Sequence, residues 1–410
     1  MRKVRYLFLI LVASILGACS LVSTPTPEPP TATLPPPPTL IPAPTDTPVP
    51  PTPTVTSTLP PTATSTPAYP PEGYGPQNFP PEVNPLTGLE ISDSDLLARR
   101  PVAIKVSIVP RTSSRPPWGL SSADLVYDYY QNDGYTRFHA IFYGEDASEV
   151  GPIRSARFPD DALIRMYKSI FAYGSADPTI NGRLFSAEYS NRLVLEGGMN
   201  LCPPTASDPL CRYDPNGFSL LLGGTSEIHS YAASRGVDDT RQNLDGMFFQ
   251  LDPPQGGVAG KTATVRYSGD SYTQWAYDPA TGRYLRLQDE VYDTGSGEVY
   301  APLIDRVNEQ QISAANVVVL FMPHSYFRPP PAEMVEISFI GGGQAYAFRD
   351  GQAYKVQWAI PSQNNVLYLT YPDGTPFPFK PGNTWFQVIG QSSVVTEPGD
   401  EAWRFEFKIP

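Results

Sequence analysis

The sequence has few of the residues that build metal centres or bind nucleic acids. Its 410 residues include three Cys and three His, too few for a zinc cluster or an iron–sulfur protein. Acidic residues outnumber basic ones by 41 to 29, and the formal net charge is −12. A general nucleic-acid binder needs a basic surface instead. We therefore expect no metal, no cofactor and no nucleic-acid partner.

Long apolar runs are also scarce. No stretch after the N-terminus reaches the ~18 apolar residues that suggest a membrane-spanning helix. At the N-terminus, positively charged residues precede the apolar run Tyr6–Leu16, which ends in Leu-Gly-Ala before Cys19. This arrangement is typical of a signal peptide, and its end is similar to the lipobox of bacterial lipoproteins. We expect residues 1–18 to be removed and Cys19 to carry the lipid that anchors the protein outside the cytoplasm. The alternative is an ordinary secretory signal with an incidental Cys.

Proline is the amino acid in clearest excess, with 49 residues against a usual ~5%. Many of these prolines alternate with Thr in residues 19–80, where charged and aromatic residues are rare. Such a composition cannot bury a core, and Pro removes backbone donors that helices and sheets need. We expect a disordered Pro/Thr-rich stalk that holds the folded part away from the membrane.

The rest of the chain predicts an α+β protein with two modules. In the first, residues 81–250, apolar alternation predicts a strand at 102–108, and Asn-Asp-Gly predicts a hairpin between 124–130 and 136–143. Helices are expected at 159–168 and 225–234, because Pro and acidic residues open the first and Gly follows the second. Strands mixed with helices make this an N-terminal mixed module.

The second module, residues 258–410, follows a Pro- and Gly-rich linker and is β-rich. Short strands separated by turns favour a sandwich or an open barrel. Gly341-Gly342-Gly343 lies between two predicted strands, which indicates a hairpin turn rather than a phosphate-binding loop.

Cys202 and Cys211 are nine residues apart in a loop rich in Pro and Asp. Disulfides persist outside the cytoplasm, so we expect these two residues to be bonded. Two free, packed thiols are the alternative.

The clearest chemical signal is the segment from Gly151 to Arg157. It places Arg154 and Arg157 three residues apart, directly before the helix predicted at Pro159. Two guanidinium groups beside a helix N-terminus can bind one carboxylate or phosphate. Arg137, on the neighbouring predicted strand, could join them.

The candidate ligand site also includes Ser155, Asp124 and Asp128. A structural alternative is that the arginines form ion pairs with these aspartates or with Asp160 and Asp161. Ser155 lies between two arginines, but no His falls in a recognisable triad motif, so we assign no catalytic residue.

Several segments, in order from about residue 82 to the C-terminus, carry a family pattern. They are residues 84–88 (Asn-Pro-Leu-Thr-Gly), 100–106, 119–127, 151–157, 275–278, 281–284, 316–319 and 382–385. Together they resemble the YerB-like or DUF3048 family of bacterial lipoproteins of unknown function. The resemblance implies an N-terminal mixed domain and a C-terminal β-rich domain, and it supplies no established reaction.

Two departures weaken any enzymatic interpretation of this resemblance. Family members tend to have an acidic Glu-Gly-Gly turn where this chain has Asn132-Asp133-Gly134, and a Pro-His-Asn step where it has Pro215-Asn216. If that Glu and His are catalytic in relatives, this chain lacks both.

The expected function is therefore that of a lipid-anchored, non-enzymatic binding or scaffold module for a cell-wall component or an envelope protein. Two alternatives stay open. One is an enzyme acting on cell-wall glycan or peptide with Asp and Arg residues of the N-terminal domain. The other is a receptor that captures a small anionic ligand between the two modules.

Overall fold

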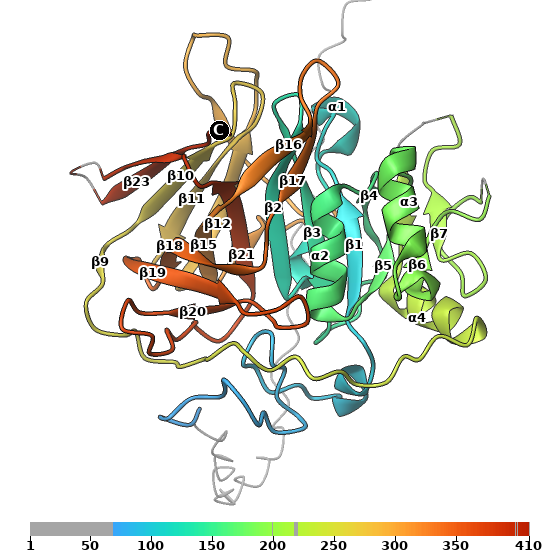
Figure 1. Ribbon diagram of the computed structural model, residues 1–410, viewed down its shortest axis with the longest axis horizontal. Helices are drawn as coiled ribbons and strands as arrows, with labels where there is room; N and C mark the ends of the chain where they lie inside the picture. Colours follow the sequence, from blue (N-terminus) through green and yellow to red (C-terminus); the bar gives the residue numbers. More distant parts are fainter. Residues whose placement is uncertain (1–68, 199, 217–219, 398, 400, 410) are drawn as a thin grey trace, which may run out of the picture. The chain divides into compact units, whose positions relative to one another are not determined.

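The computed structural model describes residues 69–198, 200–216, 220–397, 399 and 401–409 (Figure 1). The predicted signal peptide, Cys19 and most of the predicted stalk lie outside these residues. The chain divides into two compact units, residues 1–64 and 65–410, and the described residues belong to the second. Tyr74, within the predicted stalk, donates its backbone N–H to the carbonyl of Phe249 at 2.9 Å. The folded part thus begins before residue 81.

The described part of the chain is a β-rich fold with few helices, all of which precede residue 235. The α-helices are α1 (Arg111–Ser114), α2 (Phe158–Tyr167), α3 (Pro178–Ser186) and α4 (Thr225–Ser234), and the 3₁₀ turns are η1 (Ser94–Ala98), η2 (Leu120–Ser122) and η3 (Ser190–Arg192). The two predicted helices are confirmed as α2 and α4. Helix α3 was not predicted, although Asp177 caps its N-terminus by accepting from the N–H of Thr179 at 2.8 Å.

A 14-stranded sheet forms the centre of the fold. Its strands, in spatial order, are β20 (Tyr368–Thr370), β19 (Gln352–Ile360), β18 (Gly341–Arg349), β15 (Asn316–Met322), β21 (Thr384–Gly390), β2 (Leu125–Asn132), β3 (Tyr135–Phe142), β1 (Val102–Val106), β4 (Val150–Ile153), β8 (Leu221–Gly223) and β7 (Leu210–Arg212). Three more strands branch from this path: β5 (Ile170–Ala172) pairs with β1, β6 (Leu193–Val194) with β5, and β9 (Val258–Ala259) with β19.

The seam between the two predicted modules is the parallel pair β2–β21. Leu125 lies opposite Thr384 and Tyr129 opposite Val388. Backbone hydrogen bonds therefore run directly from one half of the chain to the other. The segments 81–250 and 258–410 share one sheet and fall within one compact unit.

A second, seven-stranded sheet is built from the C-terminal half alone. Its strands are β13 (Tyr300–Pro302), β12 (Arg283–Asp289), β11 (Tyr272–Asp278), β10 (Thr262–Arg266), β23 (Ala402–Glu406) and β22 (Val394–Thr396), with β14 (Ser313–Ala314) on β12. Aromatic side chains join the two sheets. Trp275 packs on Trp385 with ring centroids 5.3 Å apart, and Phe348 packs on Trp403 at 6.1 Å. Burial of such large rings stabilises the interface between the sheets.

The predicted hairpin of the N-terminal half is confirmed as β2–β3. Asp133 and Gly134 both have positive φ angles, 52° and 82°, as a tight turn between strands requires. Strand Val102–Val106 is likewise confirmed as β1.

A separate two-stranded ribbon pairs β16 (His324–Arg328) with β17 (Met334–Ile337), and β16 was not predicted. The ribbon belongs to the C-terminal half but lies beside β2 and α2 of the N-terminal half (Figure 1). This ribbon brings residues of both halves around one surface depression.

The predicted turn at Gly341–Gly343 is wrong, because these residues open β18 and pair with β19 from Ile360 back to Trp358. A Cβ atom on Gly343 would lie 2.8 Å from the indole nitrogen of Trp358. Glycine here lets the buried Trp358 ring approach the backbone.

The predicted disulfide is confirmed: Cys202 and Cys211 are bonded, with Cα atoms 4.8 Å apart. Within the described residues, helices are all too short or too polar to cross a membrane.

Candidate functional site

The site is built on one face of strands β1, β2 and β3. Lys105 on β1 lies directly opposite His139 on β3, and Tyr129 on β2 lies directly opposite Arg137 on β3. Residues paired across antiparallel strands point to the same face. Two positions apart on β3, His139 and Arg137 share that face, and Tyr127 on β2 lies opposite His139. The pleat therefore gathers three basic side chains and two tyrosines under helix α2.

A buried network connects this face to the start of α2. Asp160 is its centre: the Tyr129 hydroxyl donates to the carboxylate at 2.6 Å, Nδ1 of His139 lies 2.8 Å away, and Nζ of Lys105 lies 3.3 Å away. The other carboxylate oxygen accepts from the backbone N–H of Arg157 at 2.6 Å. Lys105, His139 and Asp160 have no exposed surface. The network therefore fixes the loop that carries Arg157.

Burial controls the protonation of this network. It lowers the pKa of Lys105 to about 7, against the attraction of Asp160, and it lowers the pKa of His139. Burial alone would raise the pKa of Asp160, but Lys105 and the hydrogen bond from His139 hold that pKa below its usual range. The Asp160 carboxylate is thus ionised and is already occupied by its buried partners.

The structure brings Arg137, Arg154, Ser155 and Arg157 together. Arg137 donates from Nη1 to the carbonyl of Ser155 at 2.7 Å, and Arg157 donates from Nη1 to the carbonyl of Ala156 at 2.9 Å. Within the described part of the chain, no carboxylate lies within 4.0 Å of any of these three guanidinium groups. The Nε atoms of Arg137 and Arg154 are buried and have no hydrogen-bond acceptor among the described residues.

The three guanidinium groups repel one another. Burial lowers the pKa of Arg137, and the charges of Arg157 and Arg154 lower it further. Burial also lowers the pKa of Arg154 and of Arg157. Asp160 offsets this effect only in part for Arg137 and Arg157. Arg137 is buried, and burying a charge is costly unless it is paired.

Arg157 and Ser155 open onto a cavity of about 410 Å³. The cavity lining includes Gln131 and Asn132 from the end of β2, Ser155, Arg157 and Phe158 at the entry to α2, Ser175, Asp177 and Ile180 around the start of α3, and Arg328, Glu333 and Val335 from the β16–β17 ribbon. The hydroxyls of Ser155 and Ser175 are 2.9 Å apart. Arg137 lies behind Ser155, and Arg154 extends from the same loop near Tyr213.

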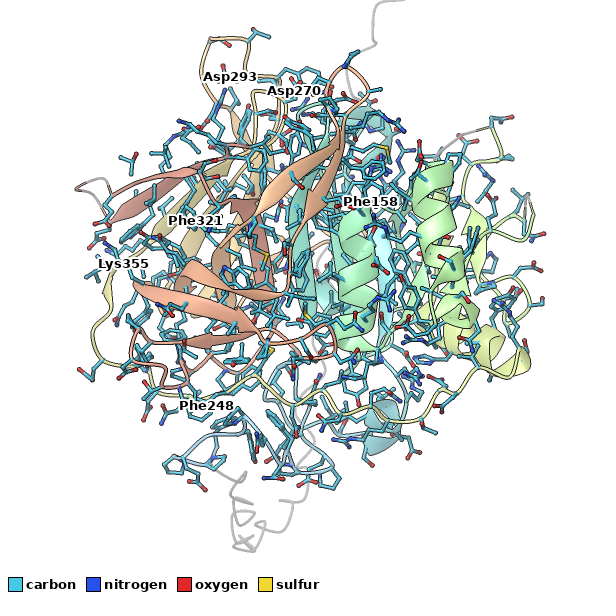
Figure 2. The ribbon with its side chains drawn as sticks, viewed as in Figure 1. Phe158, Phe248, Asp270, Asp293, Phe321 and Lys355 are labelled. Atoms are coloured by element: carbon cyan, nitrogen blue, oxygen red, sulfur yellow. A yellow bond between two sulfur atoms is a disulfide. The ribbon has the colours of Figure 1, made fainter. Side chains whose placement is uncertain are left out.

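Contacts between the two halves hold the ribbon over this cavity. Phe158, labelled in Figure 2 at the start of α2, packs against Phe327 with ring centroids 4.8 Å apart. Glu333 accepts from the Tyr130 hydroxyl at 2.6 Å and also from the backbone N–H of Asp133. The cavity therefore exists because the C-terminal ribbon docks on the N-terminal half.

The structure does not place Asp124 and Asp128 with the arginines. Asp128 lies between Tyr127 and Tyr129 on β2, so the pleat directs it to the opposite face, where it pairs with Arg286 at 2.8 Å. Asp124 accepts from Asn84 Nδ2 at 2.7 Å and from the N–H of Tyr143 at 2.5 Å. Burial raises the pKa of both aspartates. The contacts of Asp124 and Asp128 stabilise the fold, and neither residue lines the cavity.

Sequence reasoning missed the role of Lys105. A lone lysine within the apolar strand Val102–Val106 indicates a solvent-facing position, yet this side chain is fully buried. In the folded sheet Lys105 lies opposite His139, and no pattern within the strand itself indicates this pairing. Among the described residues, no group of three or more His, Cys, Asp or Glu side chains is arranged to hold a metal ion.

Comparison with known proteins places the chain in a family. The model for the N-terminal domain of DUF3048, a protein of unknown function, matches residues 86–199, and the model for its C-terminal domain matches residues 263–386. Together the two matches cover more than half of the chain. The N-terminal match includes Arg137, Arg154, Ser155 and Arg157, and both matches contribute strands to the shared sheet.

A relative and a solved structure agree with this. The chain is 26% identical to the "Putative lipoprotein YerB" of Bacillus subtilis (strain 168) over 310 residues, covering 74% of this chain and 85% of the relative. It is also similar in fold to the crystal structure of YerB protein from Bacillus subtilis, with a TM-score of 0.61 and 24% identity over 75% of this chain and 96% of that chain. The chain belongs to the DUF3048 family.

Proposed function

We propose that this protein is a lipid-anchored, extracytoplasmic binding protein whose cavity takes an anionic ligand of the cell envelope. The signal-peptide pattern before Cys19 supports the anchor, and so does the name of the Bacillus subtilis relative as a lipoprotein. The Pro/Thr-rich segment 19–80 acts as a stalk in this proposal. The stalk holds the folded part away from the membrane, where it can reach other components of the cell envelope.

One observation carries the binding proposal. Arg157 lines the cavity, Arg137 donates to the carbonyl of the lining residue Ser155, and the charges of Arg154 and Arg157 both act on Arg137. None of the three arginines forms an ion pair within 4.0 Å in the described residues. Other arginines in the fold are paired: Arg286 binds Asp128 at 2.8 Å, and Arg212 binds Glu196 at 2.5 Å. An external anion would add to the attraction of Asp160 and Asp177, which only partly offset the burial of Arg137 and Arg157.

The two halves of the chain contribute differently to this function. The N-terminal mixed α+β half supplies the arginines, and the C-terminal β-rich half supplies the ribbon that completes the cavity. A receptor that captures a small anion between its two halves fits this division. An enzyme using Asp124 or Asp128 receives no support, because both carboxylates are buried away from the cavity.

Titration calorimetry of the full chain in detergent with inorganic phosphate tests the proposal. We expect saturable binding that Arg157→Gln weakens by about 10-fold or more. The matched control is Arg241→Gln, which removes an exposed guanidinium that donates to the carbonyl of Pro81. Phosphate binding that is absent, or equally strong in Arg157→Gln and Arg241→Gln, would contradict the proposal.

A further inference from the structure

A second cavity, of about 450 Å³, lies at the C-terminal end of helix α2. The helix supplies Arg165 and its C-cap residue Lys168 to the lining. Arg192 comes from the turn η3, and Arg100 comes from the segment before β1. All four residues are partly exposed, and the lining shares no residue with the cavity beside Arg157. The second cavity is therefore a separate, cation-lined feature of the fold.

Backbone carbonyls orient three of these cations. Arg100 donates from Nη1 to the carbonyl of Lys168 at 3.0 Å, and Arg192 donates from Nη1 to the carbonyl of Ser169 at 3.0 Å. Lys168 itself donates from Nζ to two further backbone carbonyls, at 2.8 and 3.0 Å. Because these acceptors are neutral, the bonds hold the side chains in place without neutralising their charge.

Carboxylates around the cavity offset part of this charge. Arg100 pairs with Asp238 at 3.0 Å, and Arg165 pairs with Glu188 and, at 3.1 Å, with Asp161. The side chains of Asp238 and Glu188 are each 63% exposed, and exposed ion pairs contribute little free energy. Four lining residues are cationic and two are anionic, so the lining has a net charge of +2.

Lys168 and Arg192 lack such partners, because neither forms an ion pair within 4.0 Å among the described residues. Burial and the charge of Arg100 lower the pKa of Arg192 to about 10. Burial and the charges of Arg100 and Arg192 lower the pKa of Lys168. Glu188 and Asp245 offset these effects only in part. An anion in the cavity would reduce the repulsion among the cations.

The remaining lining suits a hydroxylated ligand. It consists of the amide side chains of Asn191, Gln242 and Asn364 and of one apolar residue, Val237. Hydroxyl groups both donate and accept hydrogen bonds, so amides and carboxylates can bind them. A single apolar residue gives a hydrocarbon chain little surface to pack on. The lining therefore favours a small, hydrophilic anion.

We propose that this second cavity binds the phosphate monoester of a small polyol, such as glycerol 3-phosphate. The phosphate would contact Arg192, Lys168 and Arg100, and the hydroxyls would bond to the amides and carboxylates of the lining. Guanidinium groups match the geometry of phosphate oxygens. A phosphate monoester carries about two negative charges near neutral pH, which complements the lining. The volume falls within the ~300–1,000 Å³ of small-ligand sites.

Titration calorimetry of full-length Arg157→Gln in detergent with glycerol 3-phosphate tests the inference, because this variant replaces the arginine of the first cavity. We expect saturable binding, which the addition of Arg192→Gln weakens about 10-fold or more. Adding Arg165→Gln instead should weaken it about 3-fold or more, and this surface position is the variant that folding tolerates better. The matched control is Lys355→Gln, which removes an exposed cation paired with Glu397 (Figure 2). Circular dichroism checks that each variant folds.

Three further probes on Arg157→Gln define the ligand without another variant. Inorganic phosphate lacks the polyol hydroxyls and should bind about 5-fold or more weakly than glycerol 3-phosphate. Glycerol lacks the charge and should not bind. Glycerophosphoglycerol, the water-soluble headgroup of a phosphatidylglycerol lipid, carries one charge and should also bind more weakly.

Four results would overturn the inference. They are no binding of glycerol 3-phosphate, binding that both Arg192→Gln and Arg165→Gln leave unchanged, equal or tighter binding of inorganic phosphate, and equal or tighter binding of glycerophosphoglycerol. The last result would assign the cavity to a lipid headgroup instead of a soluble monoester. None of the four bears on the site beside Arg157, which inorganic phosphate tests separately in the unsubstituted protein.

Discussion

Arg137 on β3 donates a hydrogen bond from Nη1 to the backbone carbonyl of Ser155, with a distance of 2.7 Å between the two atoms. The bond connects the central sheet to the loop that precedes α2. Its acceptor is a neutral carbonyl, so the bond orients the guanidinium without cancelling its charge. The Arg137 guanidinium therefore keeps its charge next to Ser155, which lines the cavity.

Glu333→Gln should strengthen phosphate binding about 2- to 5-fold. The substitution removes one negative charge from the cavity, while the glutamine oxygen still accepts from the Tyr130 hydroxyl. Calorimetry measures the affinity, and Glu82→Gln, an exposed residue outside the cavity lining, is the control. Unchanged or weaker phosphate binding would show that the ligand does not sense this carboxylate.

Lys105 makes stability depend on pH. Its folded-state pKa of about 7 lies below the ordinary value of 10.5, so between these values the unfolded chain binds more protons. The contribution of Lys105 to the free energy of unfolding therefore rises with pH in this window, by at most ~1.4 kcal/mol per pH unit. Urea unfolding of the protein and of Lys105→Met at pH 7 and pH 9 should show the difference, protein minus variant, increasing with pH. A difference that stays constant would mean that Lys105 does not titrate there.

The Arg286–Asp128 pair holds the two sheets together from within. Both side chains are buried, and Arg286 also lies over the ring of Trp385 at 4.4 Å. Arg286→Met should lower the free energy of unfolding by about 3–5 kcal/mol, because it leaves a buried carboxylate unpaired. Asp128→Leu combined with Arg286→Met should recover most of that loss. Equal losses in the single and double variants, measured by urea unfolding, would contradict this role for the pair.

The Cys202–Cys211 disulfide should contribute about 2–3 kcal/mol, as expected for a short closed loop. The comparison is between the protein and Cys202→Ser/Cys211→Ser, with unfolding followed by circular dichroism. Phosphate binding should be unaffected, because neither cysteine lines the cavity. Loss of phosphate binding in a folded double variant would place the loop in the site.

Local signals predicted much of the secondary structure. Asn132-Asp133-Gly134 predicted the β2–β3 turn, since Asp and Gly tolerate positive φ. Pro159, Asp160 and Asp161 predicted the start of α2. These features depend on residues that are close in the sequence.

Long-range features could not be predicted in the same way. The parallel pairing of β2 with β21 joins strands at opposite ends of the folded part, and no local pattern in either strand identifies its partner. Strand β16 and its pairing with β17 were missed because Pro323 and Pro329 flank β16 and indicate a loop. The ribbon segment supplies Arg328, Ala332, Glu333, Met334 and Val335 of the cavity lining, so this part of the lining was missed as well.

The candidate site was predicted only in part. Arg137, expected to lie on a neighbouring strand, contacts the carbonyl of Ser155, between Arg154 and Arg157. The grouping of Asp128 with them failed, because side chains alternate between the two faces of a strand. Whether these arginines bind a ligand stays a prediction.

Diffraction from crystals soaked in sodium selenate tests the central claim most directly, because selenium gives an anomalous signal that locates the anion. The account predicts an anomalous peak in the cavity, within hydrogen-bonding distance of the Arg157 guanidinium and beside Ser155. Peaks confined to other arginines, with none beside Arg157, would contradict it.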